Sequence, residues 1–275
     1  MLRIGFALLL VVMSTGAFAG AWTLERGKTH TYTTSSFTYG NHGFDNDGKL
    51  VKVPEYRKFT LNAALEYGVR DWLTAVVRGE MREETGFGEI YREPYRNPLF
   101  VEGKTGVRII YGERSQTFGA VEGGARVRLA KGERYVASAQ AVVASGGFDY
   151  DGVGAKSDGP FVEARALFGI GSPIWGKHTF FDAQAGYRVR LDSDDTDELV
   201  VDLTVGAQLL PRWMVLGQTF STLEVDGETH YTKAGGSVVY AVNERLKVEL
   251  GGIATVYGRN ALQEYGGKVG FWWAY

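Results

Sequence analysis

Long runs of strictly alternating apolar residues constrain this chain more than any other sequence feature. The run 199–210 places Leu, Val or Ala at every second position, with Asp202, Thr204 and Gln208 among the residues between them. The runs 59–69 and 181–191 repeat the pattern. A period of two predicts β-strands with one apolar face. Each run is about ten residues or longer, the length a tilted strand needs to cross a membrane, whereas strands of soluble proteins are usually nearer five or six.

The beginning of the chain predicts export from the cytoplasm. A basic start with Arg3, an apolar stretch over 4–12 and the sequence Ala17-Phe18-Ala19 form a signal peptide with cleavage expected after Ala19. The apolar stretch is too short for a membrane-spanning helix. We therefore expect two parts: a signal peptide, 1–19, and a single β-barrel domain, 20–275.

Net charge and cysteine content limit the functions that this chain could have. Loss of Arg3 changes the net charge from −2 to −3, which gives no sign of nucleic-acid binding. The chain has no cysteine, so disulfides and thiol catalysis are both excluded.

The last eleven residues form a stripe that suits a membrane interface. Tyr265, Gly267, Val269, Phe271, Trp273 and Tyr275 alternate with smaller or polar residues. Aromatic rings are enriched where hydrocarbon meets water, and apolar residues of a membrane barrel alternate outward. Further aromatic residues lie beside the same predicted strand ends: Tyr67, Trp72, Tyr135, Trp213 and Tyr240.

Turn signals divide the chain into twelve strands. We expect strands at 28–39, 56–69, 72–82, 118–130, 134–145, 161–171, 178–191, 199–210, 213–224, 230–242, 246–257 and 263–275. Short and long connections then alternate, as in a transmembrane antiparallel up-and-down β-barrel. The residues 100–111 also alternate, and we assign them to an ordered β extension inside a long outer loop, 83–117. Fourteen strands is the alternative.

These features resemble those of Gram-negative outer-membrane β-barrels over nearly the whole mature chain. The turn Glu66-Tyr67-Gly68-Val69-Arg70-Asp71-Trp72-Leu73-Thr74 is similar to one in uncharacterised barrels of phenol-degradation operons, described as transporters. The resemblance implies an outer-membrane location, contact with lipids and lipopolysaccharide, and periplasmic termini. It also implies that the barrel-assembly machinery recognises Phe271, Trp273 and Tyr275. It supplies no functional residues.

Strand parity sends many charged side chains into the lumen, because charge is costly against lipid. The candidate constriction consists of Arg78, Glu80, Glu122, Arg126, Arg128, Glu163, Arg165, Arg188, Arg190 and Asp202. Strand directions place Glu163 and Arg165 near Arg188 and Arg190, towards the outer mouth. One interpretation is a charged constriction in a narrow channel for small polar solutes. The other is a salt-bridge network that closes and stiffens the barrel, with outer loops that contact a partner, sugar or ion.

Other motifs predict no cofactor, metal or catalytic site. The loops at 45–48 and 149–152 contain Asp-Gly but fail the calcium-binding pattern, so they are interpreted as turns. The acidic run 192–198 is interpreted as a solvated outer loop, although divalent-cation binding there is an alternative. A hydrolase would need His230 beside Asp194 and Asp195, yet no nucleophile motif accompanies them. Arg259 is a candidate at the outer mouth, with a tight hairpin as the alternative.

Overall fold

The structure, a computed structural model, describes residues 20–96, 105–146, 148–149, 159–174, 176–192, 196–225, 227 and 229–275. The predicted signal peptide, 1–19, lies outside these ranges. Across the described ranges no helix is long and apolar enough to span a membrane.

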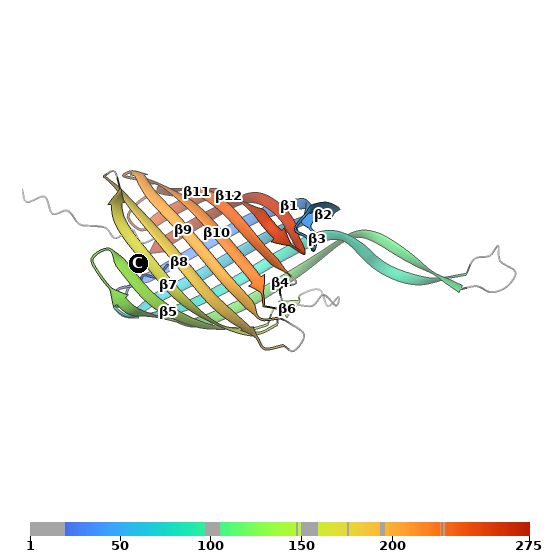
Figure 1. Ribbon diagram of the computed structural model, residues 1–275, viewed down its shortest axis with the longest axis horizontal. Helices are drawn as coiled ribbons and strands as arrows, with labels where there is room; N and C mark the ends of the chain where they lie inside the picture. The colour runs from blue at the N-terminus through green and yellow to red at the C-terminus, as the bar shows by residue number, and fades with distance from the viewer. Residues whose placement is uncertain are drawn as a thin grey trace, which may run out of the picture.

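Twelve long antiparallel strands form the fold, which confirms the predicted strand number and rules out fourteen (Figure 1). A two-residue strand, β6, pairs only with β4 and does not span the barrel. The strands are β1 (Thr29–Phe44), β2 (Leu50–Arg70), β3 (Leu73–Arg96), β4 (Thr105–Lys131), β5 (Tyr135–Ala144), β6 (Phe148–Asp149), β7 (Phe161–Ile174), β8 (Lys177–Arg190), β9 (Glu198–Leu210), β10 (Trp213–Glu224), β11 (His230–Ala241), β12 (Leu246–Arg259) and β13 (Ala261–Ala274).

The sheet closes between its first and last strands. β1 pairs antiparallel with β13, with His30 opposite Ala274, and β3 pairs with β4 on the other side of β2. The Tyr275 amide also donates a hydrogen bond to the Thr29 carbonyl at 2.8 Å. Closure matters because an open sheet edge in hydrocarbon would leave backbone groups unpaired, at several kcal/mol each.

The predicted outer loop 83–117 is largely a continuation of two strands. β3 and β4 stay paired from Leu73 opposite Val127 to Arg96 opposite Thr105. The resulting hairpin projects far beyond the barrel rim (Figure 1). The predicted end of the third strand at 82 was therefore too early and the predicted start of the fourth at 118 too late, although an ordered β extension was expected here. Continued pairing satisfies backbone groups without requiring a buried face.

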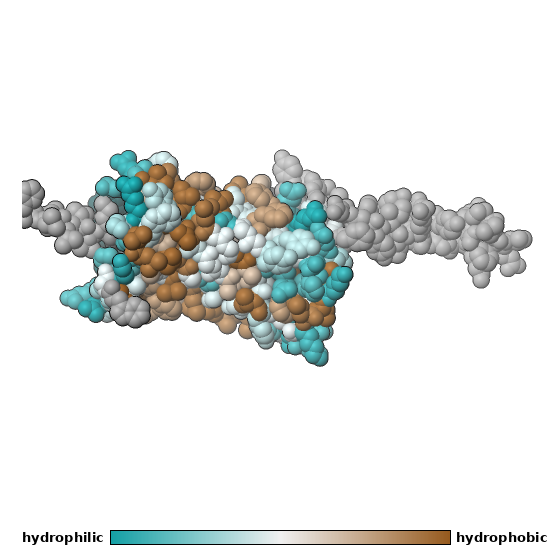
Figure 2. Space-filling model, turned by 90° about the horizontal axis from the view of Figure 1, so that it is seen from above, coloured by the Kyte–Doolittle hydropathy of each residue, from teal (hydrophilic) through white to brown (hydrophobic). Residues whose placement is uncertain are grey.

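The outer surface carries an apolar belt. In β9, Leu203 and Val205 are 38% and 54% exposed, and the intervening Thr204 lines the lumen. Apolar residues dominate the barrel wall in Figure 2, with hydrophilic residues at its two ends. An exposed apolar surface of this extent suits lipid contact and not water.

Aromatic rings mark the barrel end that has the short turns, which is the periplasmic end in this class of barrel. The Trp213 and Tyr240 rings pack in a tilted arrangement with centroids 4.7 Å apart, and Trp273 and Tyr275 stack at 5.9 Å. At the opposite end, counting alternate positions along the predicted strand 246–257 would place Tyr257 on the inward face, but Tyr257 is 56% exposed. A bulge between β11 and β12 shifts the register there, so Val256 and Tyr257 both point outward.

Candidate functional site: the lumen of the barrel

A cavity of about 740 Å³ lies inside the barrel. Small-molecule sites commonly have volumes of about 300–1,000 Å³. Among the described residues that line it, charge is balanced: six are basic and six are acidic. They are Arg78, Arg82, Arg165, Arg188, Arg190, Lys268, Glu80, Glu122, Asp182, Glu198, Asp202 and Glu249.

Three adjacent strands build an ion-pair network on one wall. The register of β7, β8 and β9 sets Glu163 beside Arg188 and Arg188 beside Glu198. Arg188 Nη2 lies 2.9 Å from Glu163 Oε2, and Arg188 Nη1 lies 2.7 Å from Glu198 Oε2. Arg165 bonds to both Glu163 and Asp202, and Arg190 bonds to Glu198. Cross-strand neighbours of opposite charge thus neutralise each other along this wall.

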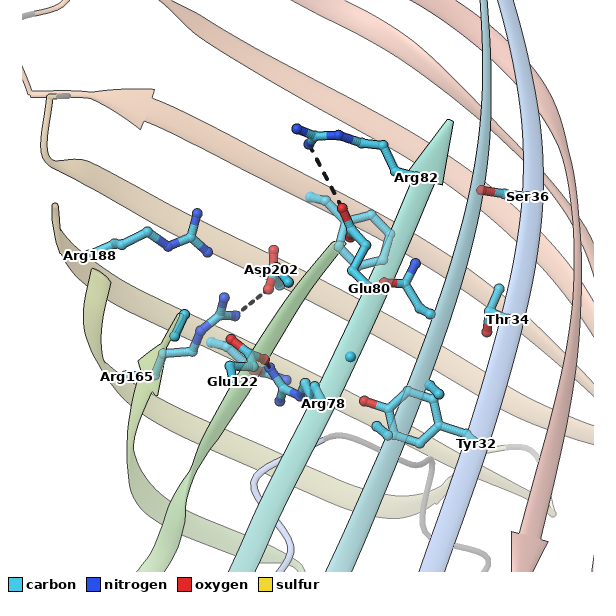
Figure 3. Close-up of a pocket in the computed structure, with 18 of the residues that line it drawn as sticks. Tyr32, Thr34, Ser36, Arg78, Glu80, Arg82, Glu122, Arg165, Arg188 and Asp202 are labelled. Carbon is cyan, nitrogen blue, oxygen red and sulfur yellow. Dashed lines mark hydrogen bonds and ion pairs between the residues drawn. The ribbon is translucent and has the colours of Figure 1, made fainter. Parts of the chain in front are cut away.

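A second group extends along β3 and β4. Arg78 and Glu122 are register partners, and Arg78 Nη1 lies 2.9 Å from Glu122 Oε1. Above them, Arg82 contacts Glu80 at 3.8 Å and Glu84 at 3.2 Å. Figure 3 shows Arg78, Glu80, Arg82 and Glu122 in the cavity lining, on the same side as the Arg165–Asp202 pair.

The wall around β1 carries fewer charged groups, with Lys268 and Glu249 paired at 2.7 Å on the neighbouring strands β13 and β12. Tyr32, Thr34 and Ser36 follow each other at every second position of β1 and line the cavity (Figure 3). Asn62 and Gln218 belong to the same lining. This wall therefore offers mainly hydroxyl and amide groups beside one Lys–Glu pair, whereas the other offers several paired guanidinium and carboxylate groups.

The N-terminal segment, residues 20–28, folds back into the periplasmic end of the lumen. Ala21 is fully buried, and its amide donates to Asp182 Oδ2 at 2.7 Å. The Ser138 hydroxyl donates to the Ala21 carbonyl, and the Leu24 amide donates to Thr74 Oγ1 at 2.8 Å. The segment is thus bonded to β3, β5 and β8, on separate parts of the wall.

Arg126 joins the N-terminal segment to the wall through a buried network. Its side chain is 1% exposed and contacts Glu66 Oε1 at 2.7 Å, where the Glu66 side chain is 3% exposed. The same guanidinium donates to Gln140 Oε1 at 3.1 Å and to the Trp22 carbonyl at 3.0 Å. The Arg126 guanidinium is therefore shared among β2, β5 and the N-terminal segment.

Apolar side chains fill the space around this segment. Ala21 packs with Val136 and Leu167, and the Trp22 ring meets Phe180 edge-on with centroids 6.4 Å apart. A second buried cluster holds Met214, Leu216, Val239 and Trp272, with Tyr32 and Phe180 against it. The cavity consequently lies on the outer side of a packed inner half.

Two glycines make room for the N-terminal segment. A Cβ atom on Gly68 would lie 2.0 Å from the Glu25 carbonyl oxygen, and one on Gly169 would lie 2.5 Å from the Trp22 ring. Neither position tolerates a side chain while the segment is in place.

The predicted site residues are only partly brought together. Arg78, Glu80, Glu122, Arg165, Arg188, Arg190 and Asp202 line the cavity, and Glu163 lies buried behind it. Arg126 holds the N-terminal segment instead. Arg128 lies beside a bulge between β4 and β5, away from the cavity lining. Arg259 is exposed, does not line the cavity and contacts the Gly227 carbonyl at 3.4 Å.

The prediction missed several lumenal residues that strand parity could have identified. Glu66 and Lys58 share the inward positions of β2, and Lys58 lies 2.8 Å from Glu264, which also contacts Lys233 at 2.9 Å. Glu198 was assigned to a solvated acidic loop, yet it is 8% exposed and pairs with Arg188. It has the same parity as Asp202, which was the available signal.

The remaining sequence motifs have ordinary contacts. The Asp45 carboxylate accepts hydrogen bonds from the amides of Asp47 and Lys49, an Asx-type turn. The His230 ring packs on Tyr257 at 5.2 Å. Its proposed acidic partners, 194 and 195, lie outside the described residues, as does most of the loop 149–158.

No protein-family model matches the chain, and no curated protein sequence does. Solved structures match it over most of its length. The COG4313 outer-membrane channel from Pseudomonas putida F1 matches with a TM-score of 0.61 and 11% identity, covering 94% of this chain and 100% of that one. The translocator domain of autotransporter NalP from Neisseria meningitidis matches with a TM-score of 0.52 and 11% identity, over 91% and 89% of the chains.

The NanC porin is also similar, with a TM-score of 0.51 and 9% identity, over 88% of this chain and 98% of that one. Identities this low show the fold alone. Together with the closed sheet and the apolar belt, these likenesses establish that the chain has the twelve-stranded β-barrel fold of outer-membrane channels and translocators.

Proposed function

We propose that the barrel forms a narrow pathway for small polar solutes across the outer membrane. The observation that carries this proposal is the polar cavity of about 740 Å³, which hydroxyl, amide and charged groups line. Two of the similar structures are a channel and a porin, which supports a transport function for this chain.

The charge pattern favours neutral or zwitterionic solutes. Equal numbers of basic and acidic groups line the cavity, and most of them contact an opposite charge. An uncompensated row of arginines would select anions, but alternating pairs produce little net field. Solutes with several hydroxyl groups could exchange their water for Thr34, Ser36 and the paired charges.

The N-terminal segment determines when the pathway is open. It occupies the inner half of the lumen, so solutes pass only when the segment moves or when narrow gaps beside it suffice. Its hydrogen bonds go to a few buried wall residues, among them Thr74, Arg126, Ser138 and Asp182. Release of the segment would leave the β-barrel intact, because the strand pairing of β1 begins at Thr29, after the segment ends.

Single-channel recording tests the proposal. Purified wild-type protein and a variant lacking residues 20–27 would be inserted into planar bilayers, with liposome swelling in a pentose and in a trisaccharide as a second measurement. We expect small steps for the wild type, larger steps for the deletion, and a reversal potential near zero in a salt gradient. Folded proteins that show neither conductance nor swelling, with or without the segment, would refute the pathway.

A closed binding barrel is the second candidate, and two observations favour it. The inner lumen is packed, and the β3–β4 hairpin projects well beyond the rim (Figure 1). Such a barrel would not conduct even without residues 20–27. Its hairpin would carry the function, so removing residues 86–113 would abolish binding to a bacterial-surface component while the barrel still folds.

A further inference from the structure

Asp182 differs from the other buried carboxylates of the barrel. Five of the six have a basic side chain as partner, whereas Asp182, at 3% exposure, has none among the described residues. The five are Glu66, Glu163, Glu198, Glu249 and Glu264. Within the described ranges, Asp182 accepts hydrogen bonds from the Ala21 amide at 2.7 Å and from Gln184 Nε2 at 2.8 Å. A buried carboxylate without a cation is costly, so its missing partner requires an explanation.

Gly20 is the residue best placed to supply a positive charge to Asp182. It is buried, lines the cavity beside Asp182, and a Cβ atom on it would lie 2.6 Å from Asp182 Oδ2. With ordinary bond lengths, the Gly20 nitrogen therefore lies within about 5 Å of the carboxylate. Gly20 is also the residue that follows the predicted cleavage site after Ala19.

We propose that processing at the Ala19–Gly20 bond creates the cation that Asp182 lacks. Water hydrolyses the peptide bond under signal-peptidase catalysis, leaving a carboxylate on Ala19 and an amine on Gly20. The amine takes a proton near neutral pH and becomes an α-ammonium group that pairs with Asp182. The uncleaved chain offers only a neutral amide at this position. Asp182 is thus a receptor site for the newly formed N-terminus, and cleavage strengthens the attachment of the N-terminal segment inside the barrel.

The proposed pairing with Asp182 explains why residue 20 is a glycine. Gly20 has no room for a side chain, because its ideal Cβ would also lie 3.0 Å from the Trp22 ring. The Ala21 amide donates to the same carboxylate oxygen, so the first two nitrogen atoms of the processed chain converge on one acidic group. Two converging donors of this kind resemble the backbone capture of a terminal group in peptide-recognition sites.

Chemical labelling of the N-terminus tests the proposal on full-length protein purified from outer membranes. An amine-reactive acylating reagent attacks only the neutral amine, and trypsin then releases the peptide Gly20–Arg26 for mass spectrometry. We expect a mature chain that begins at Gly20, with terminal labelling at least about tenfold slower in the wild type than in Asp182→Asn. Asp202→Asn is the matched control: it removes a cavity carboxylate that pairs with Arg165, and labelling should stay slow.

A second variant keeps the test decisive if Asp182→Asn does not fold. Two residues, Gly-Ser, inserted between Ala19 and Gly20 would move the amine by about 7 Å. Its labelling should be fast whether residue 182 is Asp or Asn. A mature chain that begins elsewhere would overturn the proposal. Equal labelling of wild type and insertion variant, or an equal increase in Asp202→Asn, would also overturn it.

Discussion

Replacing Arg126 by Met tests how the N-terminal segment is held. The substitution keeps a long unbranched side chain but removes the only basic partner of Glu66 in the described structure, where both side chains are at most 3% exposed. Loss of one member of a buried pair typically costs about 3–5 kcal/mol, because the other charge stays buried. Gln140 Oε1 and the Trp22 carbonyl also lose their donor. The structure therefore places the destabilisation in that range.

Urea unfolding in lipid vesicles measures this change, with tryptophan fluorescence as the signal. If the urea dependence is roughly 3 kcal/mol per M, as expected for a chain of this size, the midpoint should fall by about 1–2 M. The double variant Arg126→Met/Glu66→Met removes both charges and should regain most of the loss. Arg259→Met, at an exposed position, should stay within about 0.5 kcal/mol. A single variant as stable as the wild type, or a double variant as weak as the single one, would refute the argument.

Three further predictions concern the two faces of the barrel wall, the N-terminal segment and the last strand. Leu203→Arg, on the lipid face of β9, should cost roughly 2–4 kcal/mol and impair membrane assembly, whereas Thr204→Arg on the lumen face should cost much less; similar losses would contradict the assigned faces. Gly68→Ala should displace the N-terminal segment and speed trypsin cleavage after Arg26, because the backbone there loses its hydrogen bonds to Asp71 and residue 68, while Gly123→Ala, where a Cβ meets no atom within 4 Å, should not. Deleting residues 271–275 should abolish the heat-modifiable gel species, but Tyr275→Phe should retain it; a folded truncated barrel would argue against recognition of this strand by the assembly machinery.

Period-two alternation predicted the strand number and the lumenal side of most charges, because a barrel imposes the same geometry on every strand. It failed where that geometry is broken. The bulge near Tyr257 depends on pairing between two strands, and nothing in the residues 255–258 alone indicates it. Alternation over residues 100–111 did predict a β extension, but it could not show that β3 and β4 stay paired with each other beyond residues 82 and 118.

The N-terminal segment was beyond sequence reasoning for a different reason. Its residues 20–28 have no regular period, and their partners lie far along the chain: Asp182 is 161 residues from Ala21, and Arg126 is 104 residues from Trp22. Parity could place Asp182 and Arg126 in the lumen, but it could not show which of them would meet backbone and which would meet opposite charge.

The hydrogen bonds between Thr29 and Tyr275 set a late step in the assembly of the barrel. They join the first and last strands, so the seam forms only after the entire chain has been synthesised and exported. Contacts between residues so distant in sequence are the slowest to form. The N-terminal segment leaves β1 at this seam and bonds to β3, β5 and β8 across the lumen. Sealing of the β1–β13 seam and seating of the segment are therefore separate steps of assembly, and the finished barrel is blocked only once both are complete.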